Sequence, residues 1–262
     1  MTPQTLLAII LGISVVSYLF DQFLDYLNLR AQRKDIPAEI ADFYDKEKYQ
    51  KSLDYQADQQ RFSFISSAFS FLLSLLMLLL GGFGWLDGLL RPFIGNEILL
   101  ALAFFGVIMI VSDLLGIPFQ WYSTFVVEEK YGFNKTTIKT FILDKLKGYV
   151  IGALIGGALI SVLLYLIQTI GPNFWIWFGL LAATFILLVN MFYTSLFLPL
   201  FNKLTPLEDG TLKTAIEAFA KKVNFPLDNI FVMDGSKRSA KANAFFSGIG
   251  KKKKIVLYDT LI

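Results

Sequence analysis

Long apolar blocks separated by polar segments dominate the pattern of this chain. A helix needs roughly 20 residues to cross a hydrocarbon core of about 30 Å, and five blocks are long enough. They cover approximately residues 6–24, 62–80, 98–117, 149–170 and 174–198. The fourth block contains Gly152, Gly156 and Gly157, small residues that allow helix backbones to approach closely. The pattern predicts an all-α, multi-pass membrane domain over residues 1–200.

The pattern changes after Pro199, which we expect to end the fifth span. We expect a helix to begin at Thr205, which is a suitable N-cap. Pro206 would occupy the first helical position, and Glu208 would complete a capping box with Thr205. Apolar residues then recur at helical spacing: Leu212, Ile216, Phe219 and Val223. The polar region therefore opens with an amphipathic helix.

Three later segments have the length and apolar content of strands: residues 229–233, 242–247 and 254–258. Gly248 and Gly250 lie between the last two segments and predict a hairpin. A helix and three strands bury little core by themselves. We therefore expect residues 201–262 to be the beginning of a small α+β domain that continues past Ile262.

Composition and charge support a membrane protein. The chain is 55% hydrophobic with a mean hydropathy of +0.57, and only 17% of its residues are charged, whereas soluble domains have about a quarter. Lysine and arginine gather in the polar segments after the first, third and fifth blocks. Because positive loops stay in the cytoplasm, we expect a cytoplasmic C-terminal region and an N-terminus outside.

The first apolar block follows Met-Thr-Pro-Gln-Thr and lacks the basic start of a signal peptide, so we expect a retained helix. The net charge of +3 does not indicate nucleic-acid binding. The basic C-terminal region is suited to the surface of an anionic lipid bilayer.

The chain contains no histidine and no cysteine. A catalytic zinc site of the HExxH type needs two histidines one helical turn apart with a glutamate between them. Ser236 and Ser239 have no histidine to activate them, and no acidic cluster has the spacing of a cation site. We therefore expect no catalytic residue and no metal ligand within these 262 residues.

Three stretches resemble one known family. Residues 234–248 read Asp-Gly-Ser-Lys-Arg-Ser-Ala-Lys-Ala-Asn-Ala-Phe-Phe-Ser-Gly, residues 128–137 read Glu-Glu-Lys-Tyr-Gly-Phe-Asn-Lys-Thr-Thr, and a weaker match covers residues 36–39 and 49–55. Along the chain these stretches occur in the same order as the similar segments of the integral-membrane zinc endopeptidases of the type-I CaaX prenyl protease family, which they resemble. The resemblance implies a zincin-like domain whose HExxH helix begins shortly after the position of Ile262, so zinc would be bound by residues outside this chain.

In that family the segment around Asn243 forms an edge strand beside the zinc, and an extended substrate pairs with it. The resemblance implies that Asn243, Ala244, Phe245 and Phe246 bind substrate. The alternative is an ordinary hairpin strand with Asn243 in a turn. Eukaryotic members tend to have His-Ser-Asn-Ala-Tyr-Phe here; this chain has Lys-Ala-Asn-Ala-Phe-Phe, which resembles bacterial relatives and leaves the prenyl group of the substrate open.

The second stretch has an architectural interpretation. Gly132 supplies a turn, and Asn134 can cap a following helix whose apolar face suits the membrane interface. Asp113 lies inside the third predicted span and Asn190 inside the fifth, and ionisable groups at that depth are costly. The resemblance implies a water-filled chamber that Asp113 could face; a helix-end position near the interface is equally compatible.

The sequence therefore predicts part of a membrane zinc metalloendopeptidase that cleaves peptide bonds near the C-terminus of membrane-associated or prenylated substrates. The chain alone is expected to be inactive. The alternative is a non-catalytic scaffold, a pseudoprotease or a small transporter. A transporter would be expected to show repeated halves or paired broken helices, and the sequence shows neither.

Overall fold

A computed structural model describes residues 2–32, 35–36, 42, 45–250 and 252–262 of the protein. The chain forms two compact units, Met1–Tyr131 and Gly132–Ile262, which are described separately. Together they contain long helices and one four-stranded sheet, so the predicted fold class is confirmed.

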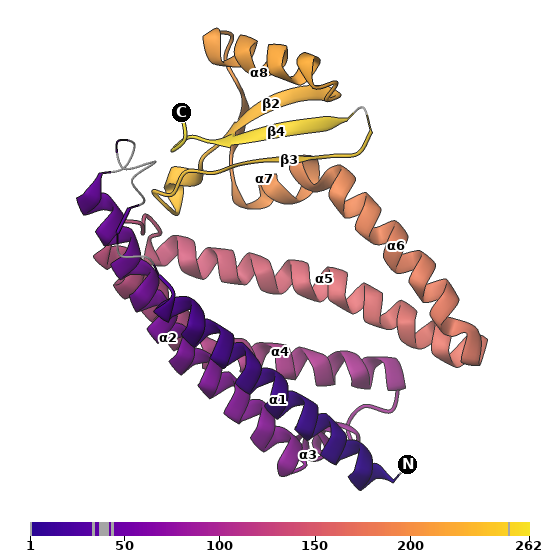
Figure 1. Cartoon of the computed structure of the whole chain (residues 1–262). Helices are drawn as coiled ribbons and strands as arrows, with labels where there is room; N and C mark the ends of the chain where they lie inside the picture. The colour runs from indigo at the N-terminus through magenta and orange to yellow at the C-terminus, as the bar shows by residue number, and fades with distance from the viewer. Residues whose placement is uncertain (1, 33–34, 37–41, 43–44, 251) are drawn as a thin grey trace. The chain divides into compact units, whose positions relative to one another are not determined.

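The first unit is helical. Its elements are α1 (Pro3–Arg30), α2 (Lys46–Leu79), α3 (Gly82–Leu90), α4 (Glu97–Tyr122) and a π-helical continuation, η2 (Ser123–Glu128). Side chains cap α2 and α4: Asp45 accepts hydrogen bonds from the amides of Glu47 and Lys48, and Asn96 accepts hydrogen bonds from the amides of Ile98 and Leu99. Helices α1 and α2 run side by side, with Tyr18 stacked on Phe71 (Figure 1). The short helix α3 was not predicted.

The second unit begins with a helical hairpin. It consists of α5 (Ile138–Ile170), the turn η3 (Gly171–Asn173), α6 (Phe174–Phe192), the π-helix η4 (Tyr193–Phe197) and α7 (Leu198–Phe201). Gly171 has a φ of +66°, a left-handed conformation that glycine adopts at little cost. The chain reverses at this glycine, so α5 and α6 diverge from the turn (Figure 1).

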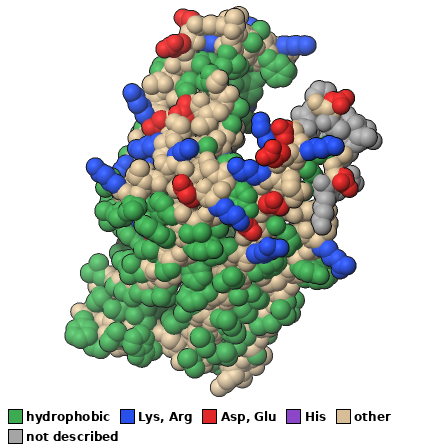
Figure 2. Space-filling model, turned by 90° about the vertical axis from the view of Figure 1, so that its left-hand side faces the viewer, with side chains coloured by type: hydrophobic (Ala, Val, Ile, Leu, Met, Phe, Trp, Pro, Cys, Tyr) green, Lys and Arg blue, Asp and Glu red, His purple; other side chains and the backbone are tan. Residues whose placement is uncertain are grey.

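Four helical stretches among the described residues are long and apolar enough to cross a membrane: Pro3–Arg30, Lys46–Leu79, Glu97–Glu128 and Ile138–Phe201. The last stretch, of 64 residues, contains both α5 and α6. Each of the five predicted spans therefore falls on a helix. Figure 2 shows apolar side chains spread over the long helices, as expected for surfaces that contact lipid.

Three expectations about helix boundaries are wrong. The predicted interfacial helix after residue 137 is not separate, because α5 runs from Ile138 without a break into the fourth span. Its N-cap is Thr137, whose hydroxyl accepts a hydrogen bond from the Thr140 amide at 3.1 Å, rather than Asn134. Pro199 does not end the fifth span. It lies in the first turn of α7, where the missing amide hydrogen of a proline costs no hydrogen bond within that helix.

The sheet contains β1 (Leu204–Pro206), β2 (Leu227–Met233), β3 (Ala244–Ser247) and β4 (Lys253–Tyr258), in the order β1-β2-β4-β3. Strands β2 and β4 are parallel, whereas β1 and β3 run antiparallel to their neighbours. The predicted hairpin is present as β3 and β4. The three predicted strands are found within two residues of their expected ends.

The predicted helix start at Thr205 is wrong. Residues Leu204–Pro206 form β1, which pairs with the end of β2, and helix α8 (Thr211–Lys222) begins six residues later. The capping pattern is local, and pairing with a distant strand overrides it. Pro206 is tolerated because it ends an edge strand. In α8 the buried position is Ala220, whereas the predicted apolar residues Leu212, Phe219 and Val223 are largely exposed.

The two faces of the sheet are covered by different elements. One face carries Met233 and Val256, which pack with Leu198 of α7 in a buried cluster. The other face carries Ile230 and Leu257, both buried, and α8 packs against it on β2. Because side chains alternate along a strand, these two sets lie on opposite sides. The sheet is therefore attached directly to the end of the α5–α6 hairpin.

Candidate substrate-binding edge of the sheet

Strand β3 lies at one edge of the sheet and presents half of its backbone groups outward. The Tyr258 amide donates to the carbonyl of Asn243 at 3.0 Å, which makes this a hydrogen-bonded pair. Bonded and non-bonded pairs alternate in an antiparallel ladder, so Phe245 and Ser247 also bond to β4. The backbone groups of Ala244 and Phe246 therefore point away from β4. Among the described strands, none pairs with this outer side of β3.

The four predicted substrate-binding residues do not share one face. Phe245 is half-buried against the core, with its ring 6.1 Å from that of Tyr193 and 6.4 Å from that of Tyr258. Phe246 is on the opposite face and is 63% exposed, with an edge-to-face contact to Phe225. Ala244 is exposed on the same face as Phe246. Phe245 packs against the buried cluster on one face of the sheet, whereas the side chains of Ala244 and Phe246 are exposed on the other face.

Asn243 lies immediately before β3 with an exposed side chain. Its carbonyl is held by the Tyr258 amide, and its side-chain Oδ1 accepts a hydrogen bond from the Ala244 amide at 2.8 Å. The Ala244 amide is one of the outward-facing donors. The carboxamide of Asn243 is therefore located on the open edge of β3, and its role in substrate binding stays a prediction.

Two contacts at the end of β4 hold the segment that precedes Asn243. The Asp259 carboxylate accepts hydrogen bonds from the Ser236 amide at 2.8 Å and from the Ser236 hydroxyl, and the Thr260 hydroxyl donates to the Lys241 carbonyl at 3.0 Å. Burial alone would raise the pKa of Asp259, but hydrogen bonds from Ser236 and from the backbone amides of Thr260 and Asp259 together outweigh it and lower the pKa below its ordinary value. At neutral pH Asp259 is an ionised anchor for this segment.

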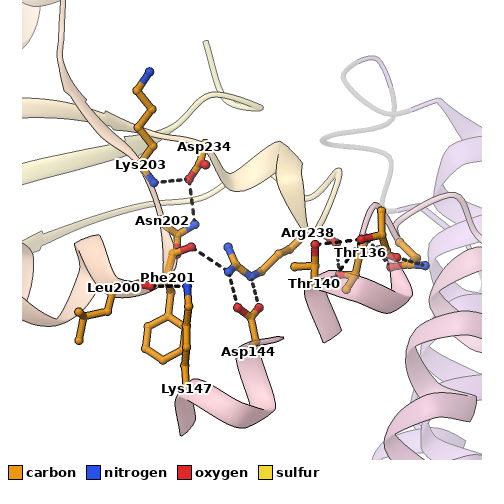
Figure 3. A network of polar contacts seen from close by, with 12 residues as sticks. Thr136, Thr140, Asp144, Lys147, Leu200, Phe201, Asn202, Lys203, Asp234 and Arg238 are labelled. Carbon is orange, nitrogen blue, oxygen red and sulfur yellow. Dashed lines mark hydrogen bonds and ion pairs between the residues drawn. The ribbon is translucent and has the colours of Figure 1, made fainter. Parts of the chain in front are cut away.

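Arg238 ties the same segment to the membrane helices (Figure 3). Its guanidinium makes a bidentate pair with Asp144 of α5, with Nε–Oδ2 and Nη2–Oδ1 distances of 2.7 and 2.9 Å. Nη2 also donates to the carbonyl of Phe201 at 2.8 Å. Near it, Asp234 accepts a hydrogen bond from the Lys203 amide, and Lys147 donates to the carbonyl of Leu200. The start of α5, the end of α7 and the segment before β3 thus form one polar network.

The two strongest sequence matches contact each other in the structure. Asn134 and Ser239 form an antiparallel bridge, flanked by hydrogen bonds from the Lys135 amide to the Arg238 carbonyl at 3.0 Å and from the Ala240 amide to the Phe133 carbonyl at 2.9 Å. The Thr136 hydroxyl also donates to the Arg238 carbonyl. The sequence contains no local signal for this pairing, because about a hundred residues separate the two segments.

The structure describes only part of the weaker sequence match, residues 36–39 and 49–55. Residues 37–39 lie outside the described residues. Within the first unit, Tyr55 is buried, donates to Glu128 at 2.5 Å and contacts the ring of Tyr131 edge-on, and the Tyr131 hydroxyl donates to Asp58. The third match and the beginning of the second therefore pack together, which indicates an architectural role for these residues.

Asp113 and Asn190 each have a hydrogen-bond partner in their own helix. Asp113 is half-buried in α4 and accepts a hydrogen bond from Gln120 at 3.1 Å. Asn190 donates to the carbonyl of Ile186 in its own helix at 2.9 Å. Asp113 belongs to the first unit and the edge strand to the second. The chamber proposed for Asp113 stays a prediction.

The residues of this chain do not fit a catalytic zinc ion. No histidine or cysteine is present in the sequence, and the described residues contain no group of three acidic side chains that could hold a metal. What the site can do chemically is bind an extended peptide backbone through Asn243, Ala244 and Phe246.

We expect Asp144→Ala to loosen the segment before β3. Both partners of the Arg238–Asp144 pair are about a quarter exposed, so its loss should cost about 2 kcal/mol, between the values for surface and buried pairs. Faster hydrogen exchange at residues 238–247 would show this. Arg91→Ala, which removes an exposed pair with Asp87 in the other unit, is the matched control and should leave that exchange unchanged.

The amino-acid sequence of this chain is similar to two protein-family models and to several known proteins. Residues 25–203 match a family model described as CAAX prenyl protease N-terminal, five membrane helices, and residues 206–262 match peptidase family M48. A CAAX prenyl protease 1 homolog of Arabidopsis thaliana is 37% identical over 261 residues, covering 97% of this chain and 62% of the plant protein. The human homolog is 39% identical over 254 residues, covering 94% of this chain and 54% of the human one.

Among solved structures, the crystal structure of S. mikatae Ste24p has a TM-score of 0.89 and 33% sequence identity. The match covers 100% of this chain and 62% of the Ste24p chain. This chain therefore spans less than two thirds of the length of the relatives that it matches.

Proposed function

The chain belongs to the CAAX prenyl protease family within peptidase family M48, and from this membership we propose that it forms the membrane-embedded, substrate-binding part of a zinc metalloendopeptidase. The observation that carries the proposal is the open outer edge of β3, with Asn243 at its start. The zinc ligands would lie in a part of the protein outside residues 1–262. When bound, zinc would supply an activated water for peptide hydrolysis.

The proposed substrate is the C-terminal region of a membrane-associated or prenylated protein. A peptide in extended conformation would add to β3 as a further strand, bonding to the outward groups of Ala244 and Phe246. Asn243 would bind a peptide amide with its carboxamide. The exposed faces of Ala244 and Phe246 would contact the substrate side chains that alternate along that strand. Lys241 stands where eukaryotic members tend to have a histidine. The proposal therefore includes substrates that carry no prenyl group.

For the membrane, we propose an N-terminus outside and a cytoplasmic C-terminal region. Basic residues are concentrated in the segments after α1, after α4 and after α7, which the positive-inside bias assigns to the cytoplasm. The proposed domains are residues 1–200 for the membrane part and residues 201–262 for the first part of the peptidase domain. The change of family model between residues 203 and 206 supports this boundary.

The test of the function is metal-dependent hydrolysis by the complete protein in detergent or vesicles. We expect o-phenanthroline to abolish cleavage of a fluorogenic peptide and added Zn²⁺ to restore it, because the metal generates the nucleophile. The non-chelating meta isomer serves as the control. Cleavage that survives chelation would contradict zinc chemistry. Peptide binding without any hydrolysis would favour the alternative of a scaffold or pseudoprotease.

A further inference from the structure

A cavity of about 480 Å³ lies within the first unit, between α2 and the continuous helix formed by α4 and η2. The residues of α2 that line it are spaced three or four positions apart, so they lie on one side of that helix. The lining is divided by polarity. One end carries the charged side chains of Asp58, Arg61 and Lys130, and the other end carries apolar and aromatic side chains.

The charged end carries one more positive than negative charge. Lys130 Nζ pairs with Asp58 Oδ2 at 2.5 Å, and the Tyr131 hydroxyl donates to the same oxygen at 2.7 Å, so the carboxylate is already paired. The side chain of Arg61 is 72% exposed and approaches Asp58 at 3.8 Å. The side chain of Lys130 is also exposed. Both cations therefore have N–H donors that an anion in the cavity could use.

The apolar end lies further along α2. The rings of Phe62 and Tyr122 are 4.7 Å apart and join the two helices there. Ile65 and Val126 line the same end with exposed side chains. Ile65 is seven residues beyond Asp58, which is a distance of roughly 10 Å along a helix. Phe62 is also the first residue of the second predicted span, so the charged end lies where polar sequence gives way to apolar sequence.

We propose that this cavity binds an anionic phospholipid, with its phosphate at Arg61 and Lys130 and an acyl chain along Ile65 and Val126. A charged end and an apolar end in one cavity match an amphiphile, whereas free phosphate would use the charged end alone. Basic pockets between membrane helices are suited to anionic headgroups, and π-helical turns such as η2 are frequent at functional sites. Lipid binding here does not depend on the proposed proteolytic function, because it involves neither the sheet nor a metal.

The first test compares two lipids that differ in headgroup charge. The complete protein in detergent is titrated with phosphatidylglycerol or with phosphatidylcholine of the same acyl chains, and bound lipid is counted by native mass spectrometry. We expect phosphatidylglycerol to bind about tenfold more tightly, because two cations attract its headgroup, and we expect added salt to reduce the preference. Equal binding of the two lipids would overturn the proposal.

A pair of variants on α2 tests the position of the site. Arg61→Ala should lower the affinity for phosphatidylglycerol about fivefold and leave that for phosphatidylcholine unchanged. Lys51→Ala removes an exposed cation from the same helix outside the cavity and is the matched control, with less than a twofold effect expected. Arg61→Lys keeps the charge and should retain most of the affinity. Equal losses in Arg61→Ala and Lys51→Ala would show general attraction to a basic surface and overturn the site.

A further comparison distinguishes a lipid from free phosphate. Inorganic phosphate, added at constant ionic strength with chloride as the control, should not displace bound phosphatidylglycerol. Ile65→Gln, which makes the apolar end polar at an exposed position, should weaken lipid binding about threefold. Displacement by inorganic phosphate, or unchanged lipid binding by Ile65→Gln, would show that only the charged end takes part and would overturn the assignment to a phospholipid.

Discussion

Replacing Asn243 with alanine in the complete protein is expected to lower kcat/KM for peptide hydrolysis by about a hundredfold, which corresponds to about 2.7 kcal/mol of lost transition-state stabilisation. The carboxamide lies on the open edge of β3, and its Oδ1 bonds the outward amide of Ala244. It would exchange this internal bond for bonds to a peptide amide. Alanine would remove both the donor and the acceptor, and would leave the paired peptide groups unsatisfied.

The controls separate substrate binding from folding. Zinc content measured by atomic emission should be unchanged, because Asn243 is exposed and its backbone contact to Tyr258 does not involve the side chain. Asn243→Asp keeps the acceptor but loses the donor, and it should also lower turnover. Ala242→Ser, one position earlier on the exposed segment, is expected to have little effect. Unchanged hydrolysis by the alanine variant would contradict the assignment of Asn243 to substrate binding.

The second large effect is expected at Gly248, which ends β3. Gly248 has a φ of +100°, and a Cβ added there would lie 2.1 Å from the carbonyl oxygen of Lys252. This neighbour is backbone, so no side chain can move aside. The hairpin would have to distort, and we expect Gly248→Ala to cost on the order of 3 kcal/mol or more.

Gly250 provides the matched control for Gly248. It also has a positive φ, of +61°, but an added Cβ would meet nothing within 4 Å. Gly250→Ala should therefore cost only about 1–2 kcal/mol, the penalty of the left-handed conformation. Hydrogen exchange at Val256 and Leu257 of β4 should accelerate much more in Gly248→Ala than in Gly250→Ala. Equal acceleration in the two variants would show that the contact with Lys252 does not restrict the hairpin.

Much of this molecule was predictable because the relevant physics is local in sequence. Insertion of a helix into a membrane depends on the apolarity of about 20 consecutive residues, so the five spans could be located from the apolar blocks. The strands around Ile230 and Val256 were also evident from short apolar runs, and Gly248 and Gly250 indicated the hairpin between β3 and β4. The resemblance to the peptidase family rested on motifs that can be identified residue by residue.

Local signals failed where distant segments compete with them. Thr205 and Pro206 match a helix start, yet they pair with Val232 and Phe231 in the sheet. Asn134 matches a helix cap, yet its side chain shapes the turn that presents the loop to Ser239. In both cases the deciding hydrogen bonds join residues that are far apart along the chain.

The sequence alone located the five long apolar helices and three of the four strands, and it showed that Asn243 belongs to a segment resembling a family motif. Only the tertiary structure decided that β3 is an edge strand, that Ala244 and Phe246 present their backbone groups outward while Phe245 packs against the core, and that residues 133–135 pair with residues 238–240. Apolar runs and turn residues act through near neighbours along the chain. The order of strands and the side on which a loop pairs depend on hydrogen bonds between segments up to a hundred residues apart, which no local pattern encodes.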